Sequence, residues 1–163
     1  MGSAIAIDQD ERLEEIRPGC PADIPQAELR QAFITPFEGA VPLATPFLGG
    51  ETIGVLVERV LPGLHGLLAE RDWDTALLVA HGGVNRALLS WFLTGAPSFL
   101  GGLAQDPGCL NIIDIGPGQA QTVVRVVNFC PLEPLQTGTR ASTMEHLLQQ
   151  YLRRNANVIE DHK

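Results

Sequence analysis

The sequence predicts an α/β fold in which helices and a sheet form layers, and three observations lead to that class. Apolar residues recur at helical spacing in residues 51–71 and again in 84–93. A short apolar run at 75–80 lies between them and is typical of a buried parallel strand. Two more apolar runs, 111–115 and 122–128, flank a Gly-Pro-Gly turn and predict a hairpin. This order of elements is typical of a helix/sheet/helix domain.

The two central helices carry recognisable internal and stop signals. Residues 51–71 contain Pro62, which removes a backbone donor and predicts a kink. The helix at 84–93 is followed by Gly95 and Pro97, residues that commonly end helices.

A final helix is expected at 140–154. Ser142 and Glu145 have the spacing of a capping box, in which each side chain satisfies a backbone donor of the other residue. A shorter helix is expected at 27–33.

The segments before residue 51 have weaker patterns. Residues 4–7 form a possible edge strand, and the charged stretch 8–16 fits either a helix or a loop. Residues 35–50 are rich in Pro and Gly, which predicts a long surface loop on the substrate side. All segments fit a single domain spanning 1–163.

Composition narrows the classes of partner. Hydrophobic residues make up 45% of the chain and the mean hydropathy is +0.10, which is enough apolar content for a core and argues against a disordered tail. The net charge of −8 disfavours nucleic acid and membrane surfaces, because both are anionic. A small phosphate ester remains compatible, since it needs only a local positive pocket.

The cysteine content predicts a reducing compartment. Cys20, Cys109 and Cys130 are odd in number and none belongs to a Cys-x-x-Cys pair, so we expect reduced thiols rather than a disulfide framework. No signal-peptide pattern opens the chain, and no apolar run reaches the length of a membrane span. The expected location is cytoplasmic.

The candidate site lies where the run at 75–80 ends. His81 follows it directly, and Gly82 and Gly83 precede the next helix. Ligands of open α/β sheets bind at the carboxyl ends of strands, and a helix N-terminus offers donors and a positive dipole to an anion. A histidine there can face phosphate oxygens or act as a base. The alternative is a histidine with a purely structural role in the turn.

Other chemistries lack their motifs. The His-Gly-Gly sequence also resembles an oxyanion-hole motif of α/β-hydrolases, but the chain has no Gly-x-Ser-x-Gly elbow. It has no His-Glu-x-x-His metal motif, and Gly116 and Gly118 lack the third glycine of a dinucleotide fingerprint. We therefore expect neither a metal nor a cofactor.

Several motifs together resemble the histidine phosphatase superfamily, whose members are similar to phosphoglycerate mutase. They occur in the family's order across roughly residues 5–128. The matching segments are Arg-Leu-Glu-Glu-Ile-Arg-Pro-Gly at 12–19, Gly-Glu-Thr at 50–52, Arg-Val-Leu-Pro at 59–62, Leu-Val-Ala-His-Gly-Gly-Val-Asn-Arg-Ala-Leu-Leu at 78–89, Cys-Leu-Asn-Ile at 109–112 and the strand at 123–128.

The resemblance implies a phosphohistidine mechanism and assigns roles. In this family a first histidine, within Arg-His-Gly, attacks the phosphoryl group, a second histidine helps hold its oxygens, and a glutamate protonates the leaving oxygen. The carry-over makes His81 the second histidine, Glu15 the acid and the Gly82 N–H a phosphate donor. Motif register favours Glu15 over Glu14, and Arg59 is interpreted as structural.

The first histidine has no counterpart, because Arg-His-Gly does not occur in the 163 residues. The sequence thus predicts a phosphoryl-transfer protein, similar to phosphoglycerate mutase and phosphomonoester phosphatases, that is truncated at its N-terminus and cannot run the phosphohistidine route alone. The alternative is a non-catalytic relic that serves as a binding or interaction module. In the family, the missing strand lies beside the one ending at His81, so we expect a homo-oligomer, simplest as a dimer, to cover that gap.

Overall fold

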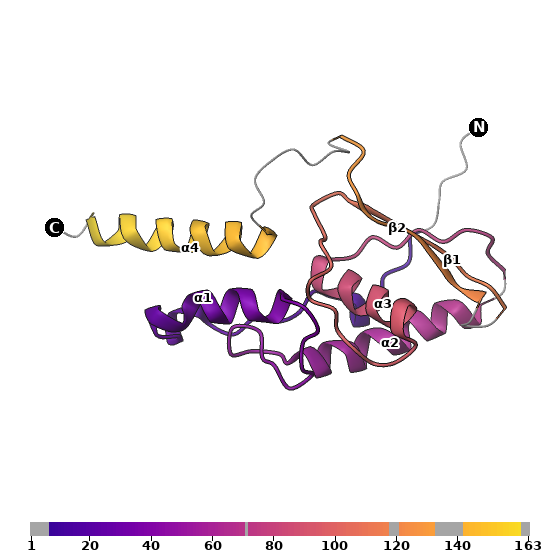
Figure 1. Cartoon of the computed structure of the whole chain (residues 1–163), viewed down its shortest axis with the longest axis horizontal. Coiled ribbons are helices and arrows are strands. Elements are labelled where there is room, and N and C mark those ends of the chain that lie inside the picture. Colours follow the sequence, from indigo (N-terminus) through magenta and orange to yellow (C-terminus); the bar gives the residue numbers. More distant parts are fainter. Residues whose placement is uncertain (1–6, 71, 118–120, 133–141, 161–163) are drawn as a thin grey trace.

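The chain folds around a pair of helices, with a small antiparallel hairpin beside them and a further helix near the C-terminus (Figure 1). This computed structural model describes residues 7–70, 72–117, 121–132 and 142–160, and it describes side chains as far as Asn155. The elements in chain order are η1 (Glu11–Leu13), η2 (Pro21–Asp23), α1 (Gln26–Ile34), η3 (Thr35–Phe37), α2 (Ile53–Ala69), α3 (Gly82–Thr94), β1 (Leu110–Asp114), β2 (Val123–Phe129) and α4 (Thr143–Glu160).

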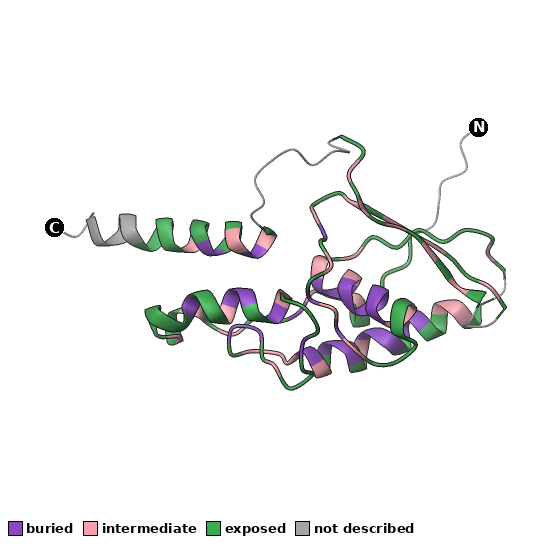
Figure 2. Cartoon of the chain, in the orientation of Figure 1, coloured by how far each residue is buried: buried purple, intermediate pink, exposed green. Residues whose placement is uncertain are grey.

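Helices α2 and α3 pack against each other and supply much of the core. Figure 2 shows buried residues concentrated along both helices. Helix α2 begins after Thr52, whose Oγ1 accepts the Val55 N–H at 3.3 Å. Helix α3 ends at Gly95, which adopts a left-handed conformation with φ 74°. Both predicted helices are confirmed, and the fully buried positions of α2 are Ile53, Leu56, Val57 and Val60.

The expected surface loop at 35–50 is exposed at most of its positions, but it packs a few side chains into the core. Its apolar residues Val41, Phe47 and Leu48 are buried. A turn of η3 starts the segment, and the Val41 N–H donates to the Phe99 carbonyl at 2.9 Å. The loop therefore contributes to stability, while its place beside a substrate stays a prediction.

The predicted strand at 75–80 is wrong. This segment has no regular secondary structure, and its apolar side chains face solvent: Leu77 is 82% exposed and Val79 is 90% exposed. A strand takes its backbone hydrogen bonds from neighbouring strands, and no described segment pairs with this one in a ladder. The apolar pattern is typical of a buried strand, but a strand is buried in a sheet only when other strands pair with both of its edges.

The predicted hairpin is confirmed as an antiparallel pair of β1 and β2. Leu110 pairs with Phe129 and Asp114 pairs with Val123, with register shifts between these ends. Asn128 has a positive φ of 56°, which places a kink near the open end of β2. The expected Gly-Pro-Gly turn ends at Gly118, which lies outside the described residues.

Helix α4 packs against α1 and begins as expected. The Ser142 N–H donates to Glu145 Oε2 at 2.8 Å, and the Glu145 N–H donates to Ser142 Oγ at 3.2 Å, so the capping box is confirmed. Met144 and Leu148 bury their side chains on the side of α4 that meets α1. The helices and the small antiparallel sheet fit the α/β class, whereas a sheet layered between helices stays a prediction.

Of the segments expected before residue 51, the helix at 27–33 is confirmed by α1. The stretch 8–16 contains only the short η1. Within the possible edge strand at 4–7, residues 4–6 lie outside the described residues, and Ile7 is exposed and belongs to no strand.

Candidate functional site

His81 is the residue that precedes the first turn of α3. Its backbone is extended, with φ −106° and ψ 169°, and its carbonyl accepts the Asn85 N–H at 2.8 Å. The imidazole makes no capping hydrogen bond to the helix and is exposed to solvent. The side chain is therefore available to a ligand that approaches the start of α3.

The Glu15 carboxylate occupies the N-terminus of α3. Glu15 Oε1 accepts the Gly83 N–H at 3.1 Å and the Ile16 N–H at 2.8 Å, while Oε2 also lies 3.1 Å from the Gly83 nitrogen. Unpaired N–H groups and the positive end of the helix dipole favour an anion at this position. The structure thus brings Glu15 to the residues that follow His81, although 68 positions separate Glu15 from Gly83.

Position 83 has no room for a side chain while the Glu15 carboxylate keeps its place. A Cβ there would collide with Glu15 Oε1 and would lie 3.4 Å from Ile16 Cγ2. At Gly82, a Cβ would lie 3.1 Å from Arg86 Nη1 and 4.0 Å from Glu15 Oε2. The two glycines therefore let one carboxylate and one guanidinium approach the same helix end closely.

Arg59 holds the segment that carries Glu15. The five N–H groups of its guanidinium are all used: two bond to the Glu51 carboxylate, and three donate to the carbonyls of Arg12, Glu14 and Glu15 at 2.7–3.0 Å. The planar fork of arginine suits this arrangement. Arg59 is structural, as expected, and it orients the backbone from which the Glu15 side chain reaches α3.

Glu51 completes this anchor. Its side chain is 5% exposed and accepts the Arg17 N–H at 2.8 Å in addition to the Arg59 bonds. Burial opposes ionisation, but the hydrogen bonds from Arg59 and the Arg17 backbone outweigh it, so the pKa of Glu51 is lowered. Glu51 is therefore a buried anion matched to a cation and a backbone donor.

A close backbone crossing supports the same segment. The Gly19 N–H donates to the Phe47 carbonyl at 3.2 Å, and the Glu51 N–H donates to the Arg17 carbonyl at 2.9 Å. A Cβ on Gly19 or Gly50 would overlap the backbone of the opposite segment. Both glycines are required by this approach. Glu14 instead points away and pairs with Arg17 at 2.9 Å, which separates the roles of the two adjacent glutamates.

Arg86 is a candidate site residue that sequence reasoning missed. It is buried, it donates from Nη1 to the Gly82 carbonyl at 3.0 Å and from Nε to the Gly101 carbonyl at 3.1 Å, and it stacks over the Phe37 ring at 5.0 Å. Burial lowers its pKa, while the nearby Glu15 charge opposes that shift. The sequence did carry a signal for this residue: Arg86 interrupts an apolar helical pattern only five positions after His81.

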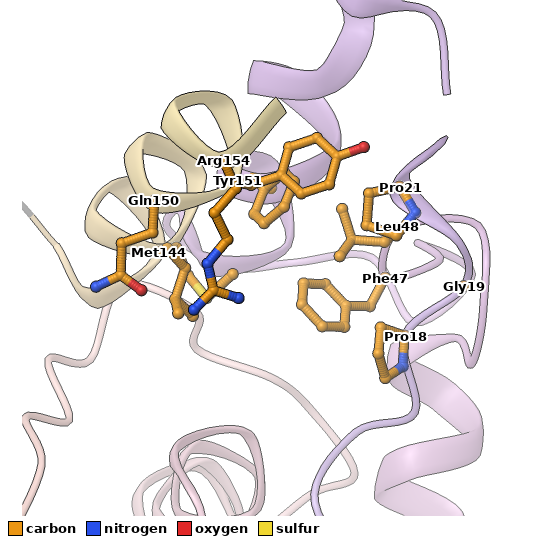
Figure 3. Close-up of a pocket in the computed structure, with 11 residues that line it drawn as sticks. Pro18, Gly19, Pro21, Phe47, Leu48, Met144, Gln150, Tyr151 and Arg154 are labelled. Carbon is orange, nitrogen blue, oxygen red and sulfur yellow. The ribbon is translucent and has the colours of Figure 1, made fainter. Parts of the chain in front are cut away.

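A cavity lies away from the start of α3. An open apolar pocket of about 330 Å³ separates α4 from the segments around Pro18 and Phe47, with Tyr151 and Arg154 along its α4 side (Figure 3). Neither His81 nor Glu15 lines it. This pocket is thus separate from the helix end at which His81 is exposed.

Two further expectations concern metals and membranes. Among the described residues, no group of three or more His, Cys, Asp or Glu side chains is placed to hold a metal ion. No helix within the same residues is long and apolar enough to cross a membrane.

Comparison with protein families supplies the classification. The model of the histidine phosphatase superfamily (branch 1) matches residues 1–128, more than three quarters of the chain. The chain belongs to the histidine phosphatase superfamily. The matched region ends at Asn128, near the end of β2, where the resemblance read from the sequence also ended. No curated protein and no solved structure matches this superfamily member.

Proposed function

We propose that this superfamily member contributes the phosphate-holding part of a phosphoryl-transfer site that acts on a small phosphomonoester. His81 and the Gly82 N–H would hold phosphoryl oxygens, and Glu15 would protonate the leaving oxygen. The observation that carries the proposal is the Glu15 carboxylate on the Gly83 N–H, directly beside the exposed His81. The group that this helix end accommodates is the carboxylate of Glu15, the residue to which the proposal gives the role of acid.

The proposal includes a restriction on turnover. The covalent route of the superfamily needs a nucleophilic histidine within Arg-His-Gly, and the 163 residues contain none. We therefore expect this chain to bind a phosphate ester and to leave phosphoryl transfer to a site completed by another segment. Phosphatase and mutase remain equally compatible, since they differ in whether water or a second substrate accepts the phosphoryl group.

Electrostatics gives the binding proposal a distinctive signature. A phosphate dianion and an ionised Glu15 carboxylate repel each other at the same helix end. Binding is therefore favoured by a neutral Glu15 side chain, which is also the form that donates a proton to a leaving group. Glu15→Gln should strengthen binding of inorganic phosphate several-fold at constant pH, and His81→Ala should weaken it.

Calorimetric titration with inorganic phosphate tests this expectation. Glu14→Gln is the matched control, because the neighbouring Glu14 carboxylate is exposed and pairs with Arg17. It should leave the affinity unchanged. Equal affinities for wild type, Glu15→Gln and His81→Ala would contradict the proposed site.

The alternative is a non-catalytic relic that acts as a binding or interaction module. The unpaired segment 75–80 favours it, because no sheet is formed beside His81 by the described residues. An assay with a generic aryl phosphate separates the two ideas when it is run with His81→Ala as the control. Robust turnover that His81→Ala abolishes would defeat the relic hypothesis. A longer native reading frame upstream of Ala4 that contains Arg-His-Gly would support the enzyme.

We also propose that a second copy of the chain covers the exposed apolar segment around Leu77 and Val79. Exposed apolar side chains on unpaired backbone favour association. Light scattering coupled to size-exclusion chromatography should report a dimer in the wild type, and a Leu77→Lys, Val79→Lys double variant should shift it toward the monomer. A wild-type chain that is monomeric at high concentration would contradict this proposal.

A further inference from the structure

Two cysteines flank the open end of the hairpin. Leu110 of β1 pairs with Phe129 of β2, and this is the outermost pair of the ladder. Cys109 and Cys130 are the next residues outward on the two strands. Residues opposite each other in antiparallel strands have Cα atoms about 4.5–5.5 Å apart. If the register is extended by one residue, the two cysteines take this spacing, which lies within the range of about 4.4–6.8 Å that a disulfide spans.

The two thiols also point at the same short segment. Cys109 Sγ lies 3.6 Å from Gln105 Oε1, and Cys130 Sγ lies 4.0 Å from Asp106 Oδ2. The Cys109 N–H donates to the Asp106 carbonyl at 3.1 Å. Since Gln105 and Asp106 are neighbours in the chain, both sulfur atoms lie beside the same two residues.

A hydrogen-bonded network holds this arrangement. Gln105 and Asn111 exchange two side-chain hydrogen bonds, at 2.8 and 3.0 Å. Asn128 accepts the Asp106 N–H at 2.7 Å and donates to Asp106 Oδ2 at 2.8 Å. The network therefore joins both strands to residues 105–106 and limits how far the cysteines can separate.

The same network adjoins the candidate site. Gln105 is buried, and its Cβ lies 4.0 Å from the position that a Cβ on Gly82 would take. Gln105 thus lies between the cysteines and Gly82, the residue that follows His81. We therefore expect a structural change at the hairpin end to shift the start of α3.

We propose that Cys109 and Cys130 form a reversible disulfide when the protein meets a hydroperoxide, so that this pair is a redox modification site beside the His81 helix end. One thiolate attacks the peroxide and becomes a sulfenic acid, with release of water (or of the alcohol, from an organic hydroperoxide). The second thiol then attacks that sulfur, the S–S bond forms and a second water leaves. The two sulfurs together lose two electrons to the peroxide, and a dithiol reductant reverses the change.

The environment of Cys109 sets the pH dependence of this reaction. Burial raises the pKa of the Cys109 thiol, and the nearby Cys130 and Asp106 charges raise it further. The thiolate is the reactive form, so oxidation should be slow at neutral pH and faster in mildly alkaline solution. The pair therefore stays reduced in a reducing compartment and responds only to sustained oxidant.

Peptide mapping after hydrogen peroxide treatment tests the proposal. The full chain is treated, its remaining thiols are alkylated, and it is digested without reductant. We expect a cross-linked peptide pair that contains Cys109 and Cys130 and lacks two hydrogens, with Cys20 alkylated separately. Dithiothreitol should abolish this pair, and Cys20→Ser should leave it unchanged.

A second experiment measures the stability of the fold. The oxidised chain should show a higher urea midpoint than the reduced chain, and Cys130→Ser should remove the difference. Three outcomes would overturn the proposal: a bridge that includes Cys20, a bridge only between two chains, or overoxidised Cys109 and Cys130 without any bridge. The mapping uses the wild-type chain, so it decides the matter even if a cysteine variant folds poorly.

Discussion

The α2–α3 pair and the segment 75–80 are both rich in apolar residues, but the helices bury theirs and the segment exposes them. Leu56 of α2 is fully buried, whereas Leu77 and Val79 are 82% and 90% exposed. A helix closes its backbone hydrogen bonds within itself, so α2 and α3 need only pack their apolar faces together. A parallel strand makes no backbone hydrogen bonds within itself and depends on neighbouring strands for them. The helices are therefore ordered, whereas the segment 75–80 has no strand partner among the described residues.

The largest expected difference lies between Leu56→Ala and Leu77→Ala. The first creates a cavity in the core and should lower the free energy of unfolding by about 2–5 kcal/mol. The second removes an exposed side chain and should change it by less than about 0.5 kcal/mol. Urea unfolding at a protein concentration where the chain is monomeric measures both. Similar losses for the two variants would break the comparison, because Leu77 would then be covered in the folded monomer.

A somewhat smaller effect is expected at the anchor of Glu15. Arg59→Met leaves the Glu51 carboxylate and three carbonyls without their partner, and should cost about 3 kcal/mol of unfolding free energy. Arg17→Met is the matched control, since Arg17 is solvent-exposed and pairs with an exposed Glu14. It should have a much smaller effect. Chemical denaturation measures both variants. Equal losses of unfolding free energy would show that the Arg59 hydrogen bonds stabilise the fold no more than the exposed Arg17–Glu14 pair does.

A pair of glycine exchanges sharpens the picture of the site. Gly83→Ala places a methyl group against Glu15 and should cost about 1–3 kcal/mol. Gly66→Ala lies at an exposed position of α2, where a Cβ would be 3.9 Å from Arg12 Nη2, an ordinary contact, and should stabilise by up to about 1 kcal/mol. Thermal unfolding distinguishes the two signs. A stabilising Gly83→Ala would mean that Glu15 does not contact the start of α3 in solution.

The smallest effect concerns pH. Because the folded-state pKa of Glu51 is below its ordinary value of 4.5, this group stabilises the fold above that pH. The contribution is lost as the pH falls through the folded pKa. Glu51→Gln should therefore be less stable at pH 7 and should show a flatter decline below about pH 4.5.

Unfolding free energies measured from pH 7 to pH 3 test this prediction. Glu58→Gln makes the same exchange at an exposed position of α2 and should reproduce the wild-type curve. A Glu51→Gln curve parallel to the wild type would contradict the role given to the buried carboxylate.

Local patterns predicted the helices, the hairpin and the capping box well. Helix α3 and its end at Gly95 follow from spacing and from a residue that adopts a left-handed conformation readily. Ser142 and Glu145 bond to each other across three positions, so their interaction is readable from the chain alone. Each of these features depends on contacts within a few residues.

The prediction that was wrong and the residue that was missed both depend on contacts between segments far apart in the sequence. The segment 75–80 carries the composition of a buried strand, but composition does not say whether a partner strand is present. Arg86 looked like one polar residue within a helical motif, and only its contacts to Gly82, Gly101 and Phe37 give it a place at the site.

The sequence by itself determined the family, the helical frame and the candidate residues His81, Gly82 and Glu15, because motifs and periodicity are local properties of the chain. The tertiary structure decided that the Glu15 carboxylate lies on the α3 N-terminus, held through Arg59, and that the apolar run before His81 has no strand partner. Both depend on segments far apart in sequence. Backbone hydrogen bonds and close approaches between such segments are satisfied only in three dimensions.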